Sequence, residues 1–298
     1  MTVLEAIQKS AEFLGKKNVA APRLQTELLL AHLLKLPRMK LYLNFDRELS
    51  AAETDALREL VKRRGRREPL QHIVGTTSFH GLEMAVNGQA LIPRPETELL
   101  AEAGWQFLLA RPAPDRLNDG AAAATALPAA LDFGTGTGCI AIVLAHKCPG
   151  ARITALDVSE AALMLARENA AANGVAERIE FLAGDGFAAL GGVREFDLII
   201  SNPPYIPSAE IATLEPEVRD FDPRAALDGG ADGLDFYRRL ATQAPGFLQA
   251  DGRIMLEFGD GQAEEIRAIF TGEKWIVEAV REDYSQRPRI LIARRDKI

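Results

Sequence analysis

The residues best placed to do chemistry are the four consecutive ones Asn202-Pro203-Pro204-Tyr205, which directly follow the apolar run at residues 196–201. This run has the β-branched residues and sharp bounds of a buried strand, so the four residues stand at its carboxyl end. In open α/β sheets, ligands bind at that edge. Each proline fixes its own φ and keeps the preceding residue extended, so the segment cannot become helical.

The expected turn presents two hydrogen-bond acceptors side by side, the side-chain oxygen of Asn202 and the main-chain carbonyl of Pro203. The ring of Tyr205 stands beside them. Two adjacent acceptors match the two hydrogens of a planar NH2 group. The alternative is a strand end capped by a proline-rich turn without a chemical role, and these residues alone leave both interpretations open.

A second segment with chemical potential is Gly134-Thr135-Gly136-Thr137-Gly138, between a predicted strand that ends at Phe133 and a predicted helix from Ile140. Glycines let the backbone approach a ligand closely and adopt conformations that a Cβ forbids. A dinucleotide-binding loop would have a glycine at position 139, where this chain has Cys139. The spacing therefore favours a nucleoside with an amino-acid tail over a nicotinamide or flavin cofactor.

Two aspartates are predicted to lie at the same edge of the sheet. Asp157 closes the second strand, where an acidic side chain takes ribose hydroxyls. Asp185 follows the third strand, where it is placed to accept a hydrogen bond from an adenine amino group. Either aspartate alone could be a helix or turn cap. Their register with the glycines and Asn202 favours a ligand site.

Taken together, these segments resemble the class I S-adenosylmethionine-dependent methyltransferases. The Asn-Pro-Pro-Tyr turn is similar to that of enzymes that methylate planar nitrogens, which are adenine-amino DNA methyltransferases and protein glutamine methyltransferases. Nearly the whole chain resembles the glutamine branch, specifically the release factor glutamine methyltransferases. The segments that carry this resemblance are residues 69–75, 91–98, 132–138, 201–206, 221–227 and 230–234.

The resemblance implies methyl transfer from S-adenosylmethionine, with S-adenosylhomocysteine as product, to the glutamine side-chain amide in the Gly-Gly-Gln motif of class 1 peptide chain release factors. The family often has an aromatic residue where this chain has Gly186, so Phe187 is expected to cover the adenine. The implied substrate-binding residues are Asn202, Pro203, Pro204 and Tyr205, of which Asn202, Pro203 and Tyr205 serve the transfer itself. The implied cofactor-binding residues are Gly134, Thr135, Gly136, Thr137, Gly138, Asp157, Asp185, Gly186, Phe187 and Asn202.

Three other functions are weighed against this one. Within the glutamine branch, a ribosomal protein stays open as the substrate. A DNA adenine methyltransferase needs a basic cleft for phosphates, yet residues 76–298 carry 21 Lys and Arg against 33 Asp and Glu. A nucleotide-binding module without enzymatic activity would leave residues 202–205 unexplained. We therefore expect a protein partner and no nucleic-acid substrate.

The composition, 47% hydrophobic and 26% charged over 298 residues, is that of a soluble globular protein. No apolar stretch approaches the ~20 residues of a membrane span, and the N-terminus lacks the pattern of a signal peptide. Cys139 and Cys148 cannot form a disulfide framework, and the four histidines lack metal-ligand spacing. We expect a cytoplasmic protein that binds neither membrane nor metal.

Residues 1–75 are predicted to form a small helical domain that recognises the protein substrate. They include a capping box at residues 50–53 and a basic helix tail at residues 62–67. This region carries 14 Lys and Arg against nine Asp and Glu, which indicates either a macromolecular partner or a solvated helix face. A β-hairpin linker is predicted at residues 76–93, with its turn at Asn87-Gly88.

Residues 94–298 are predicted to form the methyltransferase domain, in which strands and helices alternate. Such alternation predicts a doubly wound, Rossmann-like α/β sheet of seven strands. Only a short turn precedes the last strand, so that strand is expected to be antiparallel. Residues 111–128 are interpreted as a loose surface insertion. The predicted strands span residues 131–133, 153–156, 179–182, 195–201, 253–258, 275–280 and 289–293.

Overall fold

The computed structural model describes residues 1–111, 127–192 and 195–296. The described chain divides into two compact units, a helical unit of residues 1–76 with 213–222, and a catalytic unit of residues 77–212 with 223–298. The insertion expected at residues 111–128 falls almost entirely on residues 112–126, which lie outside the described residues. No helix within the described ranges is both long enough and apolar enough to span a membrane.

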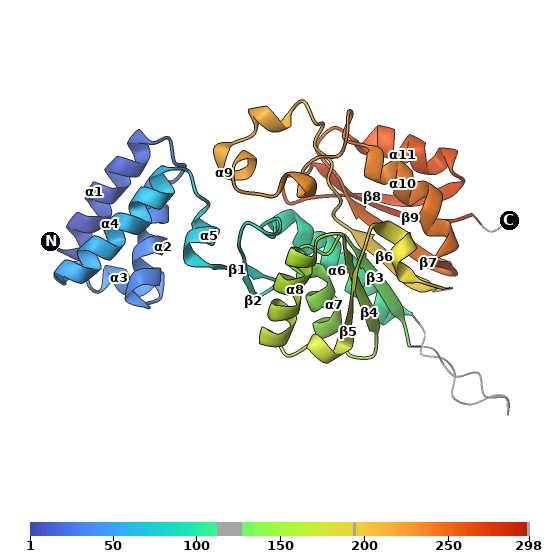
Figure 1. The fold of residues 1–298 in the computed structure, drawn as a ribbon, viewed down its shortest axis with the longest axis horizontal. Coiled ribbons are helices and arrows are strands. Elements are labelled where there is room, and N and C mark those ends of the chain that lie inside the picture. The colour runs from blue at the N-terminus through green and yellow to red at the C-terminus, as the bar shows by residue number, and fades with distance from the viewer. Residues whose placement is uncertain (112–126, 193–194, 297–298) are drawn as a thin grey trace. The chain divides into compact units, whose positions relative to one another are not determined.

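The helical unit is stabilised by a core of apolar residues from its first five helices, as the sequence predicted for this region. Capping boxes start two of these helices, one formed by Thr2 with Glu5 and the predicted one formed by Ser50 with Glu53. Figure 1 shows the helices in blue to cyan. They are α1 (Val3–Lys16), α2 (Pro22–Leu34), α3 (Arg38–Tyr42), α4 (Ala51–Gly65) and α5 (Leu70–Val74), joined by α9 (Pro216–Arg219) from the segment 213–222.

The basic tail of α4 is largely neutralised inside the helical unit. Arg64 is only 4% exposed, and its guanidinium donates to Gln25 Oε1 at 2.9 Å and to Glu217 Oε1 at 2.7 Å. Arg67 pairs with Glu217 at 2.5 Å and with Glu215 at 2.6 Å. Part of the positive charge that indicated a partner or a solvated face is therefore satisfied by carboxylates from the segment 213–222.

The catalytic unit is built on a sheet of seven strands among the described residues, in the order β5-β4-β3-β6-β7-β9-β8. Strands β3 to β7 run parallel, and β9 is antiparallel to both β7 and β8. The predicted α/β class and the antiparallel last strand are confirmed. The strands are β3 (Ala129–Phe133), β4 (Arg152–Asp157), β5 (Ile179–Ala183), β6 (Phe196–Ser201), β7 (Leu248–Glu257), β8 (Trp275–Glu282) and β9 (Pro288–Arg295).

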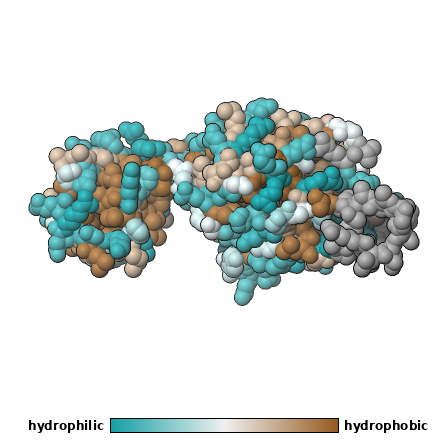
Figure 2. Space-filling view, turned by 90° about the horizontal axis from the view of Figure 1, so that it is seen from below, coloured by the Kyte–Doolittle hydropathy of each residue, from teal (hydrophilic) through white to brown (hydrophobic). Residues whose placement is uncertain are grey.

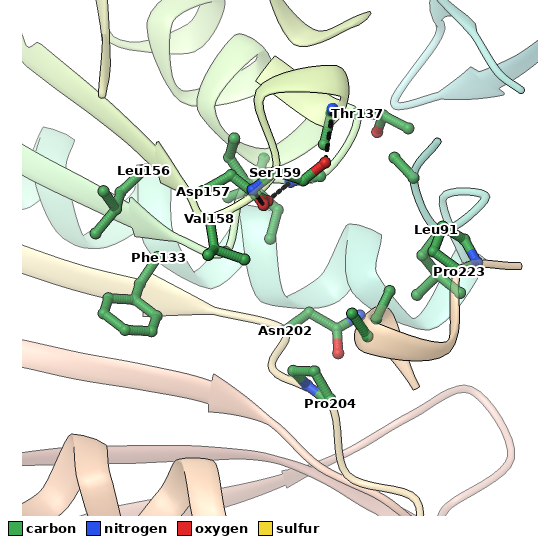
Figure 3. A pocket seen from close by; sticks show the side chains of 18 of the residues that line it. Leu91, Phe133, Thr137, Leu156, Asp157, Val158, Ser159, Asn202, Pro204 and Pro223 are labelled. Carbon is green, nitrogen blue, oxygen red and sulfur yellow. Dashed lines mark hydrogen bonds between the residues drawn. The ribbon is translucent and has the colours of Figure 1, made fainter. Parts of the chain in front are cut away.

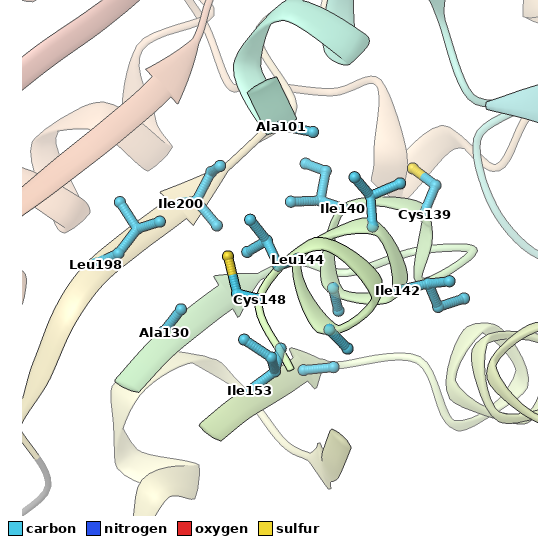
Figure 4. Close-up of a cluster of buried hydrophobic side chains, with 14 of the residues drawn as sticks. Ala101, Ala130, Cys139, Ile140, Ile142, Leu144, Cys148, Ile153, Leu198 and Ile200 are labelled. Carbon is cyan, nitrogen blue, oxygen red and sulfur yellow. The ribbon is translucent and has the colours of Figure 1, made fainter. Parts of the chain in front are cut away.

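Helices cover both faces of this sheet. One apolar cluster joins the sheet to α6, α7 and α8, and a second cluster joins the other side to α10 and α11. Figure 4 shows the first cluster, in which Leu144 and Cys148 lie among Ala130, Ile153 and Leu198. Because α7 is apolar along its whole buried length, it packs as a core helix. The helices are α6 (Pro95–Ala110), α7 (Cys139–Lys147), α8 (Glu160–Ala172), α10 (Asp235–Gln243) and α11 (Ala263–Gly272).

The hairpin predicted with its turn at Asn87-Gly88 is not formed, since residues 90–92 are not a strand, and a shorter hairpin lies earlier in the same segment. Its strands are β1 (Thr76–Phe79) and β2 (Leu82–Ala85), so the turn lies at His80-Gly81, where both residues have positive φ. Tertiary contacts explain this choice, because the His80 ring packs on Trp105 and its main-chain N–H donates to Glu98. The Asn87-Gly88 pair instead lies in a later turn, beyond both strands of the hairpin.

Candidate active site

The loop between β3 and α7 is held in a conformation that glycine suits best. Gly134, Gly136 and Gly138 all have positive φ, at 75°, 55° and 80°. A Cβ at Gly138 would also lie 2.9 Å from the Cβ of Ala166 on α8. The N–H groups of Gly134 and Thr135 donate to the Leu156 carbonyl of β4, so the loop lies tightly against the next strand.

Asp132, at the start of this loop, is fully buried and ties the loop to α7. Its Oδ2 accepts hydrogen bonds from Thr135 Oγ1 at 2.6 Å and from the Ala141 N–H at 3.1 Å. Its Oδ1 has no hydrogen-bond partner among the described residues. Burial raises the pKa of Asp132 to about 7, and the two hydrogen bonds lower it only in part. The carboxyl group of Asp132 therefore holds the loop against the first turn of α7.

Asp157 ends β4 and accepts two main-chain hydrogen bonds. Oδ2 accepts from the Gly136 N–H at 2.8 Å, and Oδ1 accepts from the Ser159 N–H at 2.9 Å. Figure 3 shows Asp157 and Ser159 joined in this way at the edge of a pocket. The same carboxylate thus caps a turn, as the alternative interpretation held, and also lines the pocket.

The pocket is a cavity of about 240 Å³ at the carboxyl ends of β3, β4 and β6. It brings together most of the predicted site residues from four separate loops, which follow β3, β4, β5 and β6. Those that line it are Gly134, Thr135, Gly136, Thr137, Asp157, Asp185, Gly186, Asn202 and Pro204. The predicted residues that do not line it are Gly138, Pro203, Phe187 and Tyr205.

Phe187 lies in the core of the catalytic unit rather than at the pocket. Its ring packs against Phe133 at 5.0 Å and Phe247 at 4.8 Å between ring centroids, and it is 3% exposed. The pocket wall beyond Asp185 is formed instead by Gly186 and the guanidinium of Arg239. Arg239 Nη1 donates to Asp185 Oδ1 at 2.6 Å. A Cβ at Gly186 would lie 2.0 Å from Arg239 Nη2, so the arginine occupies the space of a side chain there.

Asn202 lies at the end of β6, on the far side of the pocket from Asp157, as Figure 3 shows. Its Nδ2 donates to Thr97 Oγ1, on the first turn of α6, at 3.0 Å. This bond leaves the amide oxygen of Asn202 as the acceptor of the group. Pro203 is buried beneath it, and Pro204 lines the pocket.

Tyr205 leaves the pocket and packs against the second apolar cluster. Its main-chain carbonyl accepts a hydrogen bond from Gln262 Nε2 at 2.9 Å. Burial, together with the neighbouring Glu257 charge, raises the pKa of its phenol to about 12. The phenol is therefore neutral at physiological pH.

Several pocket residues carried no site assignment from the sequence. The segment before α6 contributes Leu91, Ile92, Pro93 and Arg94, and the segment before α10 contributes Pro223, Ala225 and Ala226. Both segments contain motifs that carried the family resemblance, which was the available signal. Thr97, which belongs to the 91–98 motif, also lines the pocket, and so do Phe236 and Arg239, for which only helical spacing was visible beforehand.

Known protein families match both units. The family described as PrmC N-terminal domain matches residues 5–75, and the family described as methyltransferase small domain matches residues 121–214. A methyltransferase structure from Pyrococcus furiosus matches 79% of this chain and 99% of its own, with a TM-score of 0.51 and 18% identity. That likeness concerns the fold alone.

Relatives of similar length match almost the whole chain. A release factor glutamine methyltransferase from Geobacter sulfurreducens is 44% identical over 270 residues, which cover 91% of this chain and 88% of the relative. One from Chlorobaculum tepidum is 42% identical over 293 residues, which cover 97% and 95% of the two chains. At this identity and coverage, the chain belongs to the release factor glutamine methyltransferase family.

Proposed function

We propose that this protein transfers a methyl group from S-adenosylmethionine to the side-chain nitrogen of the glutamine in the Gly-Gly-Gln motif of class 1 peptide chain release factors. The observation that carries the proposal is the placement of Asn202 in one pocket with the glycine loop and Asp157. The names of the relatives, which specify a release factor and a glutamine, support the choice of substrate. Release factors act on cytoplasmic ribosomes, so the cytoplasm is the proposed location.

The residues on the strand β3 and β4 side of the pocket fit the cofactor. Gly134 and Gly136 line the pocket without a side chain and with positive φ, so a nucleoside could approach the backbone there. Asp157 and Asp185 both line the pocket, where Asp157 would accept from the ribose hydroxyls and Asp185 from an adenine amino group. When bound, S-adenosylmethionine supplies an electrophilic methyl group on a sulfonium sulfur.

Asn202 and Pro203 would hold the target amide. Its nitrogen is a poor nucleophile because the lone pair is delocalised into the carbonyl. Accepting both of its hydrogens, on Asn202 Oδ1 and the Pro203 carbonyl, would fix the nitrogen in one orientation and favour the positive charge that develops on it. Pro204 would complete the turn that presents these acceptors, and Tyr205, whose ring packs on the second apolar cluster, would anchor that turn to the core.

The proposed methyl transfer needs no dedicated catalytic base. A bond forms between the amide nitrogen and the methyl carbon while the carbon–sulfur bond breaks, and the electron pair stays on sulfur in S-adenosylhomocysteine. The N-methylated amide cation is strongly acidic, so it releases its proton to water.

The helical unit would bind the release factor. Large apolar side chains are exposed on it, among them Leu24, Met39 and Leu43, the last of which is 79% exposed. The helical unit, at the left of Figure 2, shows hydrophobic residues gathered on its surface. Exposed apolar patches of this kind are typical of protein-binding surfaces. Residues 205–212 and 223–233 would frame the opening through which one glutamine enters, since Pro223 and Ala225 line the pocket.

In the test, the enzyme and labelled S-adenosylmethionine are incubated separately with three candidate methyl acceptors. These are a purified class 1 release factor, isolated ribosomal proteins and adenine-containing duplex DNA. We expect label on the release factor alone, and mass spectrometry should map it to the glutamine of Gly-Gly-Gln. Label confined to a ribosomal protein or to DNA would overturn the proposal and identify the substrate that replaces it.

A further inference from the structure

Glu257, the last residue of β7, carries a buried carboxyl group beside Asn202. In the parallel pair of β6 and β7, Ser201 lies opposite Leu256, so the next residues along the two strands are Asn202 and Glu257. Glu257 is 2% exposed, and glutamates are almost never so buried unless they are paired. Yet its Oε2 has no hydrogen-bond partner among the described residues. Such a group needs an explanation.

Thr97 joins this pair from the first turn of α6 and is 3% exposed. Its Oγ1 accepts a hydrogen bond from Asn202 Nδ2 at 3.0 Å, which leaves the hydroxyl hydrogen of Thr97 to donate elsewhere. Burial raises the pKa of Glu257 to about 7, and hydrogen bonding by Thr97 and Asn202 lowers it in part, so both face the carboxyl group. Side chains from three elements therefore meet here, of which Thr97 and Asn202 line the pocket and Glu257 does not.

This arrangement distinguishes the two ends of the Asn202 amide. In the observed orientation, Nδ2 donates to Thr97, and Thr97 keeps its own hydrogen available for Glu257. If the oxygen and NH2 group of the Asn202 amide exchanged places, the oxygen would accept the hydroxyl hydrogen of Thr97. An acceptor would then lie beside the buried carboxyl group of Glu257. Leaving a buried polar group without its donor is unfavourable, so the observed orientation is preferred.

We propose that Thr97 and Glu257 are positioning residues for methyl transfer, which hold the Asn202 amide with its NH2 toward the protein and its oxygen free for the substrate. The inference rests on the proposed function, in which Oδ1 of Asn202 accepts a hydrogen from the target amide. An acceptor that is fixed in advance needs no reorganisation during the transfer. Thr97 and Glu257 act through Asn202 and not on the reacting atoms.

Two pairs of variants separate the hydrogen bonds from the shapes of the side chains. Thr97→Val removes the hydroxyl and keeps the volume, whereas Thr97→Ser keeps the hydroxyl. Glu257→Leu removes the acceptor, whereas Glu257→Gln keeps an oxygen for Thr97. We expect Thr97→Val and Glu257→Leu to slow single-turnover methylation of the release factor about 10- to 100-fold, and the conservative partners to stay within about fivefold of the wild type.

Cofactor affinity and a remote substitution provide the controls. Calorimetry should show S-adenosylmethionine binding within about threefold of the wild type in all four variants, because the loop and Asp157 are intact. Thr154→Val, a buried threonine on β4 outside the pocket, should leave the transfer rate unchanged. Equal losses in Thr97→Val and Thr97→Ser, or none in Thr97→Val and Glu257→Leu, would overturn the inference.

A spectroscopic measurement tests the orientation without any release factor. In protein labelled with ¹⁵N-asparagine, the side-chain NH2 signals of Asn202 are identified by their loss in Asn202→Ala. We expect these hydrogens to exchange slowly with water in the wild type and in Thr97→Ser, and rapidly in Thr97→Val. Rapid exchange in the wild type would refute the positioning role, whereas slow exchange without release factor methylation would count against the proposed substrate alone.

Discussion

The two sides of the pocket are built in different ways. On the cofactor side, main-chain groups hold the site, since both oxygens of Asp157 accept backbone N–H groups and the glycine loop donates to the β4 backbone. On the transfer side, side chains hold one another, since Asn202 donates to Thr97 and both face Glu257. The cofactor side is therefore fixed by local chain geometry, and the transfer side by contacts between distant elements.

This difference separates binding from transfer. A site built from the backbone should keep its shape when a single side chain on the other side is changed. A site built from interlocking side chains should lose function when one member is removed, because its partners are then left unsatisfied in a buried place. Substitutions on the two sides should accordingly affect different measurements.

The largest effect is expected at Asn202. Asn202→Ala should reduce single-turnover transfer by about 10²–10³, the size found on deleting one preorganised polar partner from an active site. Calorimetry should show nearly unchanged S-adenosylmethionine affinity, because the glycine loop and Asp157 remain. Asn173→Ala, which removes an asparagine outside the pocket, is the matched control. Robust transfer by Asn202→Ala would mean that the turn only caps a strand.

Asp157→Ala should show the opposite pattern to Asn202→Ala, because it should lower the cofactor affinity more than the transfer rate. Asp157→Ala should weaken S-adenosylmethionine binding by about 1.5–3 kcal/mol, since hydrogen bonds to a charged group are lost. At saturating cofactor, the transfer rate should fall much less than it does in Asn202→Ala. Unchanged affinity in the calorimeter would remove Asp157 from the cofactor site.

Glu257 should make the stability of the catalytic unit depend on pH. Burial raises the pKa of its carboxyl group to about 7 in the folded protein, above its ordinary value of 4.5. The folded state then holds its proton more tightly, so this contribution to stability is complete below about pH 4.5 and is lost as the pH rises through about 7. Between pH 5 and 8, chemical denaturation should show a loss of about 1–3 kcal/mol that Glu257→Gln reduces.

Asp132 provides the comparison on the cofactor side. Burial raises its pKa to about 7 as well, so Asp132 adds a loss of the same sign over the same window. Glu257→Gln should therefore abolish only part of the pH dependence. A pH profile of stability that is identical in the wild type and in Glu257→Gln would contradict a raised pKa at Glu257.

The smallest effect is expected at Arg239, a side chain on the otherwise main-chain-built cofactor side. Its ion pair with Asp185 is partly exposed, and such pairs contribute about 0.2–1 kcal/mol. Arg239→Ala should weaken S-adenosylmethionine binding by only about two- to fivefold. The adjacent Arg238 pairs with Asp232 away from the pocket lining, so Arg238→Ala is the control. An equal loss in Arg238→Ala would show that Arg239 has no specific role.

The elements that could be predicted from the sequence are the ones that depend on local pattern. The strand that ends at Ser201 and the capping box at residues 50–53 lie where their patterns indicate. The glycine loop and Asp157 end the two strands of one strand–helix–strand unit, so their meeting in the pocket follows from the fold class.

The features that could not be predicted depend on long-range packing. Phe187 stands two residues after Asp185, but its ring packs in the core because Phe133 and Phe247 offer it an apolar site there. Thr97 and Glu257 are far from Asn202 in the chain, and the position of Glu257 follows only from the register of β6 with β7. Sequence patterns carry no record of such pairing.

The central claim, that the transfer side selects an NH2 group, is tested most directly by varying the target atom. Single-turnover transfer would be measured on three variants of the release factor, which carry glutamine, glutamate or asparagine as the third residue of the Gly-Gly-Gln motif. Two adjacent acceptors repel a carboxylate and receive no hydrogen from it, and asparagine is one methylene too short. We predict transfer to glutamine alone, whereas transfer to glutamate at a comparable rate would contradict the account.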